Sequence, residues 1–328
     1  MNQDIAVAGM KNRVKISSAF DPTADVVLYQ GDCLDFLRSV PDRFFKLIIT
    51  SPPYNLGKVY EKRIDMDRYL AQQTFVIKEC YRTLADSGSI CWQVGNFVYK
   101  GRIAPLDILL YPIFESLGCQ LRNRIIWSFG HGLHASRRFS GRYEVILWFT
   151  KSNQYLFNLD AVRIPQKYPQ KKHFKGPKRG QLSCNPLGKN PTDIWNIPNV
   201  KANHVEKTVH PCQFPVELVE RLVLSMTQIG DWVLDPFMGV GTTAIGAIIH
   251  KRKAAGAEIL AEYVRVSKER IRDAERGSLR IRPVERTIFE PNSGKKNIPP
   301  KYINLRQEAS QLELVSINNE DSLPERTR

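Results

Sequence analysis

The chain has 328 residues with 48 Lys or Arg and 33 Asp or Glu, which gives a formal net charge of +15 and a pI near 9.6. This length can bury a full hydrophobic core, and the charge indicates a polyanionic partner. Without a run of 18 apolar residues or a leader pattern, we expect no membrane span and no signal peptide. The six cysteines are scattered and the histidines lack metal-ligand spacing, which predicts a cytoplasmic protein with reduced thiols and no metal site.

The first half of the chain alternates between short apolar strands and amphipathic helices, after an N-terminal arm or edge strand over residues 1–25. This alternation predicts a doubly wound α/β sheet. The expected strands are Val26–Tyr29, Phe45–Thr50, Ser89–Val94, Leu121–Phe129 and Tyr143–Thr150. The expected helices are Cys33–Val40, Met66–Ala85 (ended by Ser87 and Gly88) and Ile103–Leu117. Asp32 occupies the favoured N-cap position of the first helix.

The strand Phe45–Thr50 ends in Ser51, Pro52, Pro53 and Tyr54. Neither proline has an N–H, and each disfavours a helical conformation in the residue before it, so the strand continues into a stiff, extended turn. Ligands of open α/β sheets bind at the carboxyl ends of the strands. The turn is therefore a candidate site, although an ordinary loop is the alternative. Asn55–Asp65 follows as a polar segment that we expect to be a mobile loop over the site.

Two stretches are unusually basic. Gly130–Arg142 holds Arg137, Arg138 and Arg142, which predicts phosphate contacts beside the site, with a solvated loop as the alternative. Residues 151–209 hold eleven Lys or Arg against three acids, and Tyr168, His173, Phe174 and Trp195 are interleaved among them. This composition favours nucleic-acid binding over a disordered basic linker, because Trp195-Asn196-Ile197 indicates packed structure. The candidate contacts in this segment are Lys171, Lys172, Lys175, Lys178 and Arg179.

The last elements of the sheet follow residue 209. Pro215 begins a helix over Val216–Thr227, and a strand over Trp232–Asp235 leads into a turn with Gly239 and Gly241 before a helix over Ala244–His250. Glycines after a strand let a ligand approach the backbone closely. The next strand, Lys253–Glu258, places Glu258 where it can accept hydrogen bonds from a ribose, with a helix cap as the alternative. A closing helix covers Ala261–Glu275, and residues 277–328 form a C-terminal extension with a disordered end.

Two of these motifs together resemble the DNA amino-methyltransferases of the β class. Thr-Ser-Pro-Pro-Tyr-Asn, ending at Asn55, looks like their catalytic loop, and Asp-Pro-Phe-x-Gly-x-Gly-Thr-Thr, ending at Thr243, looks like their S-adenosylmethionine loop. The catalytic loop comes first, which is the order of this class. The resemblance spans roughly residues 26 to 272, and it implies a Rossmann-like doubly wound methyltransferase sheet, mostly parallel with one antiparallel strand, plus an inserted target-recognition region.

The resemblance divides the chain and assigns its site. It implies a catalytic half over residues 26–150, a target-recognition region over 151–209 and a cofactor-binding half over 210–276. Ser51 and the Pro52 carbonyl would accept the N–H groups of the target amine, and Tyr54 would stack on a base that has left the duplex. The residues expected to bind S-adenosylmethionine are Asp32, Gln213, Phe214, Asp235, Pro236, Phe237, Gly239, Gly241, Thr242, Thr243 and Glu258.

The sequence alone does not decide the target atom or the partners. Members of the family with Ser at the first position of the catalytic loop more often methylate cytosine N4, whereas the Asn55-Leu56-Gly57 continuation also occurs in enzymes that methylate adenine N6. We favour cytosine N4 over adenine N6. An RNA methyltransferase, a glutamine methyltransferase and a non-catalytic nucleic-acid-binding protein are the alternatives, and the large basic segment speaks against glutamine. The expected partners are double-stranded DNA and a separately acting restriction endonuclease, with the protein a monomer or homodimer.

Overall fold

The structure is a computed structural model that describes residues 13–130, 132, 134–201 and 203–283. The described residues form two compact units, one of residues 13–162 with 192–283 and one of residues 163–191. Of the basic region expected over 151–209, residues 151–162 and 192–209 belong to the first unit. The expected C-terminal extension lies outside the described residues from 284 onward. None of the helices within the described ranges is both long and apolar enough to cross a membrane.

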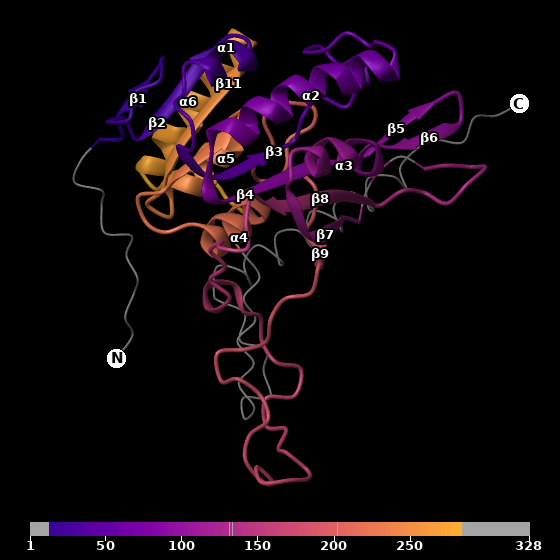
Figure 1. Ribbon diagram of the computed structural model, residues 1–328, viewed down its shortest axis with the longest axis vertical. Coiled ribbons are helices and arrows are strands. Elements are labelled where there is room, and N and C mark those ends of the chain that lie inside the picture. Colours follow the sequence, from indigo (N-terminus) through magenta and orange to yellow (C-terminus); the bar gives the residue numbers. More distant parts are fainter. Residues whose placement is uncertain (1–12, 131, 133, 202, 284–328) are drawn as a thin grey trace, which may run out of the picture. The chain divides into compact units, whose positions relative to one another are not determined.

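The first unit is built on a nine-stranded sheet with the order β1-β2-β11-β10-β3-β4-β8-β7-β9 (Figure 1). Its strands are β1 (Ile16–Ser17), β2 (Val26–Gln30), β3 (Phe45–Thr50), β4 (Leu84–Val94), β7 (Gln120–Ser128), β8 (Tyr143–Thr150), β9 (Ile194–Asn196), β10 (Trp232–Asp235) and β11 (Lys253–Glu258). β8 pairs antiparallel with both β4 and β7, and every other neighbouring pair in this sheet is parallel. One strand therefore runs against the rest, as predicted.

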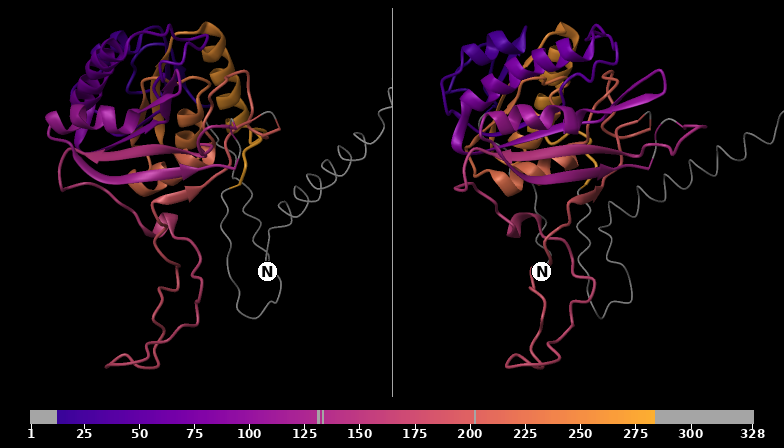
Figure 2. Two further views of the ribbon diagram at one scale, coloured as in Figure 1. Left: turned by 90° about the vertical axis from the view of Figure 1, so that its right-hand side faces the viewer. Right: turned by 45° about the vertical axis from the view of Figure 1, so that its right-hand side comes forward.

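Helices cover both faces of the sheet, and each face has its own hydrophobic core (Figures 1 and 2). The first face carries α1 (Cys33–Arg38), α2 (Met66–Thr83) and α3 (Leu106–Ser116). The second face carries α4 (Val216–Met226), α5 (Thr242–Ile248) and α6 (Ala261–Glu275). A short 3-10 helix, η1 (Asp160–Val162), contacts α4. This arrangement is the predicted doubly wound architecture.

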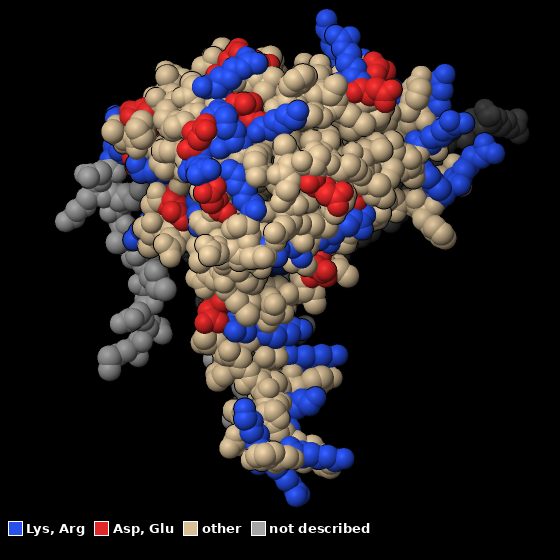
Figure 3. All heavy atoms as spheres, in the orientation of Figure 1, with Lys and Arg blue, Asp and Glu red and all other residues tan. Residues whose placement is uncertain are grey.

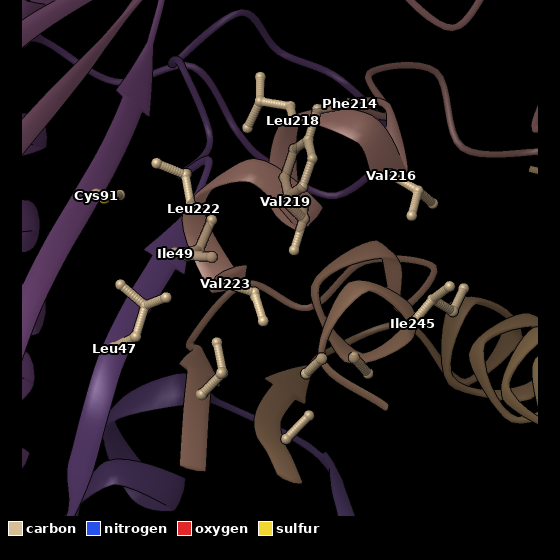
Figure 4. Packing of buried hydrophobic residues seen from close by; sticks show 14 of the residues in the cluster. Leu47, Ile49, Cys91, Phe214, Val216, Leu218, Val219, Leu222, Val223 and Ile245 are labelled. Carbon is tan, nitrogen blue, oxygen red and sulfur yellow. The ribbon is translucent and has the colours of Figure 1, made fainter. Parts of the chain in front are cut away.

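The packing of α4 shows how the second face is held. Its apolar residues recur at helical spacing on one side, so that Leu222 and its neighbours meet Leu47 and Ile49 of β3 (Figure 4). α5 approaches α4 closely at Gly246, where an added Cβ would lie 2.4 Å from a Val219 methyl carbon. Because the site begins where β3 and β10 end, this tight packing fixes the platform beneath it.

Two element boundaries on the first face differ from the sequence-based expectation. The helix expected over Ile103–Leu117 starts only at Leu106, because Asn96–Tyr99 (β5) and Arg102–Pro105 (β6) pair as an antiparallel hairpin. Its two turn residues, Lys100 and Gly101, both have positive φ, the conformation that two-residue hairpin turns need. The expected break at Ser87 and Gly88 is also wrong, since β4 runs through these residues from Leu84.

Two further differences concern short elements. α5 begins at Thr242, two residues earlier than expected, because Gly241 adopts a left-handed conformation at its N-cap. β9 was not predicted as a strand, although Trp195 was expected to pack. Trp195 and Ile197 are buried, and the Trp127 indole donates to the Ile197 carbonyl at 2.7 Å. Packing against β7 therefore turns this short segment into an edge strand.

Candidate active site

A cavity of about 630 Å³ lies at the carboxyl ends of β2, β3, β10 and β11. Its walls come from the turns that follow these strands, from residues 55–64, from α2 and from the segment around His210. Such a volume suits a cofactor-sized ligand. The catalytic residues predicted from the sequence, Ser51, Pro52, Pro53 and Tyr54, all line it. So do eight of the predicted cofactor residues, namely Asp32, Gln213, Phe214, Pro236, Phe237, Gly239, Thr242 and Glu258.

Asp235 lies behind the cavity wall instead of lining it. Its carboxylate accepts the Thr50 hydroxyl and the Thr243 hydroxyl, each at 2.7 Å, and the Phe237 N–H at 3.1 Å. Burial raises the pKa of Asp235 to about 6, against the effect of these hydrogen bonds. Gly241 and Thr243 are also absent from the cavity lining. Asp235 therefore joins the end of β3 to the start of α5 and holds the two loops together.

The catalytic turn carries a chain of hydrogen bonds that leads away from the cavity. Ser51 Oγ lies 3.1 Å from the Tyr54 hydroxyl, and that hydroxyl donates to Glu144 Oε2 at 3.2 Å. Gln93 Nε2 donates to the same carboxylate oxygen. Burial raises the pKa of Tyr54 well above its usual value, with the Glu144 charge adding to the effect, so Tyr54 stays protonated.

These partners decide which way the protons point. Glu144 receives two donors, which is the arrangement that an ionised carboxylate needs, although burial raises its pKa. Since the Tyr54 proton is directed at Glu144, the Ser51 hydroxyl donates to the Tyr54 oxygen. The lone pairs of Ser51 are then available as acceptors, and the chain polarises them. Glu144 and Gln93 were not identified as site residues from the sequence; a lone acid before the apolar stretch Val145–Thr150 was the one signal that pointed to Glu144.

The cofactor side of the cavity is held by hydrogen bonds to backbone groups. The carboxylate of Glu258 accepts the Gly239 N–H at 3.0 Å and the Leu260 N–H at 2.8 Å. Gly239 has a φ of 54°, a conformation that glycine adopts without strain. Glu258 thereby shapes the turn after β10 and is also one of the residues that line the cavity. The helix cap that was the alternative role for Glu258 is wrong, because the N-cap of α6 is Leu260 and no side chain caps it. Asp32 does cap α1, with its carboxylate accepting the Leu34 N–H at 2.7 Å.

The segment before α4 forms another wall. Gln213 is fixed at both ends of its amide, donating to the Glu206 carbonyl at 2.9 Å and accepting the Thr208 hydroxyl at 2.8 Å. The His210 ring stacks on Tyr60, with centroids 5.4 Å apart. Burial lowers the pKa of His210 to about 4, so its ring is uncharged at neutral pH. Tyr60 belongs to the polar loop after the catalytic turn, and its contact was not foreseen from the sequence.

That polar loop is internally organised. The Asn55 side chain donates to the Ile64 carbonyl at 2.7 Å and accepts the Ile64 N–H at 2.8 Å, and Asn55 is 2% exposed. Glu61 accepts the backbone N–H groups of Asn55 and Leu56, each at 2.8 Å. Asn55 therefore closes the loop upon itself. The predicted mobility of this loop stays a prediction.

Comparison with known proteins places this geometry in a family. Residues 45–269 match the family model N6_N4_Mtase, described as DNA methylase. The chain is 52% identical over 241 residues to the type II methyltransferase M.BglII of Bacillus subtilis, covering 73% of this chain and 67% of that protein. The chain belongs to this DNA methylase family.

Two solved structures bear on the fold and the cavity of this methylase. A Thermus thermophilus protein assigned as a DNA modification methylase was solved with S-adenosylmethionine; it is 30% identical, has a TM-score of 0.53, and the match covers 76% of this chain and 93% of that one. The cytosine-N4-specific PvuII DNA methyltransferase is 22% identical with a TM-score of 0.61, and the match covers 78% of this chain and 93% of that one. The latter supports the fold alone.

The cavity of the methylase fits S-adenosylmethionine in its chemistry. The ligand combines an adenine ring with hydroxyl and amino donors, and the wall combines apolar groups such as Phe214 and Phe237 with the carboxylates of Asp32 and Glu258. In addition, Gln73 of α2 lines the cavity with a buried Oε1 that has no hydrogen-bond partner among the described residues. A buried acceptor without a donor is costly, and a bound ligand with N–H or O–H groups would satisfy it.

The basic residues of the methylase fall in both units. Arg137 and Arg138 are exposed in the loop between β7 and β8, and Arg142 is partly buried there, donating to the Gly141 carbonyl at 3.0 Å. In the second unit, residues 163–191 contain eight Lys or Arg and no acid, and Figure 3 shows such side chains along the segment. The five predicted contacts, Lys171, Lys172, Lys175, Lys178 and Arg179, are all exposed. Two short antiparallel bridges, Ile164 with Lys189 and Lys172 with Leu182, order this unit.

Proposed function

We propose that this methylase transfers a methyl group from S-adenosylmethionine to the exocyclic amino group of a base in double-stranded DNA. The observation that carries the proposal is the hydrogen-bond chain from Ser51 through Tyr54 to Glu144, of which Ser51 and Tyr54 line a cofactor-sized cavity. An exocyclic amine is a weak nucleophile because its lone pair is delocalised into the ring. Acceptors that hold its N–H bonds return electron density to the nitrogen.

The residues of the catalytic turn supply these acceptors. Ser51 Oγ, polarised by Tyr54 and Glu144, and the Pro52 carbonyl would each accept one N–H of the amine. The Tyr54 ring would stack on the extrahelical base, since a base inside the duplex cannot be reached. Tyr69 supports the turn by donating from its hydroxyl to the Pro53 carbonyl at 2.9 Å. The protein thus contributes orientation and polarisation more than covalent chemistry.

S-adenosylmethionine, when bound, supplies an activated methyl group on its sulfonium. We assign its binding to the cavity lined by Asp32, Gln213, Phe214, Phe237 and Glu258. Asp235 and Thr243 would support this binding by fixing the loop after β10, since they lie behind the wall. This supporting role replaces the direct contact with the ligand that the sequence motif alone suggested for Asp235.

For the target atom, we propose cytosine N4, with adenine N6 as the alternative. Ser51 at the first position of the catalytic turn supports cytosine through the family correlation. The Asn55-Leu56-Gly57 continuation was the argument for adenine, but Asn55 is buried and both ends of its amide bind Ile64. Asn55 therefore has a structural role in the loop that either kind of enzyme could use, which reduces its weight as a sign of adenine specificity.

The test is to incubate the protein with duplex DNA and labelled S-adenosylmethionine, digest the DNA to nucleosides and identify the product by mass spectrometry. We expect N4-methylcytosine. N6-methyladenine would keep the mechanism and reverse the base assignment. If the cofactor binds but neither product forms, the DNA proposal fails, and competition between duplex DNA and RNA then tests the RNA alternative. A non-catalytic binding protein would show no transfer to either.

DNA contact by the basic residues is proposed on charge and exposure. Replacing Arg137 and Arg138 by Gln should reduce the slope of log affinity against log salt by up to about 2, because each phosphate contact contributes roughly 0.9. The matched control replaces Arg43 and Arg276, two exposed arginines near the amino ends of the strands, and should leave the slope unchanged. The five basic residues of the second unit should show the same kind of effect. An unchanged slope in the variant that lacks Arg137 and Arg138 would exclude these two arginines as phosphate contacts.

We further propose that the enzyme serves restriction–modification, as the name of the type II relative M.BglII suggests. A separately acting endonuclease of the same specificity would be its functional partner. The expected result is that DNA methylated by this protein resists that nuclease while unmethylated DNA is cut. The protein is a monomer or a homodimer on this proposal, and sedimentation of the purified protein would distinguish the two.

A further inference from the structure

The loop between β7 and β8 carries a phenylalanine in an unusual position. Phe139 is 99% exposed, the highest value among the large hydrophobic residues of the described chain. The Ala135 N–H donates to Ser140 Oγ at 3.1 Å, so residues 136–139 form the tip of a closed loop. Arg137 and Arg138 at the same tip are exposed. An exposed aromatic ring beside two exposed arginines is the combination that nucleic-acid contacts use, because the ring can stack on a base while the guanidinium groups bind phosphates.

The sheet topology places this loop at the edge that holds the active site. β8 runs antiparallel to β4, and β4 is parallel to β3, so β8 begins at the edge where β3 ends. Glu144, the second residue of β8, accepts the Tyr54 hydroxyl. Phe139 precedes Glu144 by five residues, a stretch that spans at most about 18 Å. The ring is therefore within a few base-pair steps of the position where a base would meet Tyr54.

A base that enters the cavity leaves a gap in the duplex and an unpaired partner. Opening this gap costs unpairing and unstacking energy, and DNA-binding proteins offset such costs with apolar side chains inserted between bases. We propose that Phe139 enters the duplex at the position vacated by the target base and stacks there, while Arg137 and Arg138 hold the flanking phosphates. This inference rests on the proposed function, and it makes Phe139 a positioning residue that acts on the DNA without touching the reacting amine.

The experiment uses the full-length protein and two duplexes, after the methylated sequence has been located by sequencing treated DNA. One duplex is fully paired, and the other has an abasic site opposite the target base, so that the target has no pairing to lose. The variants are Phe139→Ala and Phe139→Trp. Ile229→Ala is the matched control. Ile229 is 71% exposed in the turn before β10, at the amino ends of the parallel strands and so away from the cavity at their carboxyl ends. The measurements are kcat/KM on each duplex and the Kd for S-adenosylmethionine.

We expect Phe139→Ala to lower kcat/KM on the paired duplex by about 10- to 100-fold, the range that loss of a stacked aromatic ring produces. On the duplex with the abasic site it should stay within about threefold of wild type, since little opening cost remains. Phe139→Trp, which can still stack, should stay within about threefold on both duplexes. Ile229→Ala should match wild type on both, and no variant should change the Kd for S-adenosylmethionine.

Two results would overturn the inference. In one, Phe139→Ala matches wild type on the paired duplex, which would mean that the ring takes no part. In the other, it loses activity equally on both duplexes, which would make it a general DNA contact or a folding defect. A failure of the proposed function looks different, because wild-type protein would then transfer no methyl group to either duplex.

Discussion

Two turns at the same edge of the sheet use their polar groups in opposite ways. β3 and β10 are neighbouring parallel strands, and each ends in a motif recognised from the sequence. In the turn after β10, Asp235 uses its carboxylate to bind Thr50, Thr243 and the backbone, and is 1% exposed. In the turn after β3, Ser51 and Tyr54 line the cavity and are hydrogen-bonded to each other, with Tyr54 also bonded to Glu144. Within the turn after β10, Asp235 is thus a structural brace, whereas Ser51 and Tyr54 of the turn after β3 line the cavity, although the sequence of each turn indicates a ligand loop.

The largest effect should come from the turn after β3. Tyr54→Ala removes both the stacking ring and the hydroxyl that polarises Ser51, so we expect kcat to fall by at least about 100-fold. Tyr54→Phe keeps the ring and removes the hydroxyl, and should lose about tenfold. Calorimetry should show wild-type affinity for S-adenosylmethionine in both. A parallel loss of cofactor affinity or of stability would make Tyr54 a structural residue and remove the contrast between the two turns.

Replacing Asp235 should lower both the stability and the cofactor affinity of the protein. Asp235→Ala leaves the Thr50 and Thr243 hydroxyls and one backbone N–H without an acceptor in a buried place, and should lower the free energy of unfolding by roughly 2–4 kcal/mol. Cofactor affinity should fall with it, because the turn after β10 loses its anchor. Urea denaturation and calorimetry on the same preparation check both. If affinity falls while stability stays at the wild-type value, Asp235 contacts the ligand directly.

A smaller effect is expected where the turn after β3 meets the core. Glu144→Ala should lower kcat by about tenfold, because it leaves the Tyr54 hydroxyl and the Gln93 amide without their acceptor. Glu144→Gln retains an acceptor for Tyr54 and should remain within about threefold of wild type. The readout is a fall in kcat at unchanged KM for S-adenosylmethionine. Glu269→Ala, which removes an exposed carboxylate on α6, is the control and should have no effect. Equal losses in the Ala and Gln variants would argue against a hydrogen-bonding role.

The smallest effect concerns pH. Burial raises the pKa of Asp235 from 3.8 to about 6 in the folded protein, so the folded state holds this proton more tightly than the unfolded state. The cost of burying the charged carboxylate therefore lowers the free energy of unfolding above about pH 6, and this cost disappears as the pH falls toward 4. Relative to Asp235→Asn, wild type should gain about 1 kcal/mol of stability between about pH 7.5 and about pH 5. Urea titrations at both pH values measure the difference, and a gain of the opposite sign would contradict the assignment.

Much of the fold could be predicted because its signals are local. Phe45–Thr50, Tyr143–Thr150, Lys253–Glu258 and Ala261–Glu275 have the boundaries that apolar runs and helical periodicity predicted. The errors arose where a distant partner decided the conformation. Residues 102–105 became a strand because β5 pairs with them, and β4 begins already at Leu84, which pairs with Phe45 of β3, where a helix end was expected.

For the site, the sequence by itself determined the two turn motifs, because prolines, glycines and the residues beside them act through neighbouring backbone. It identified Ser51, Tyr54, Phe214 and Glu258 as residues that line one cavity. The tertiary structure decided which polar side chains are hydrogen-bonded to each other. Tyr54 and Glu144 are 90 residues apart and meet because the antiparallel strand β8 pairs with β4, and Thr50 and Asp235 are 185 apart and meet because β10 lies beside β3. Hydrogen bonds between residues so far apart in the sequence depend on the order of the strands in the sheet, which no local sequence pattern contains.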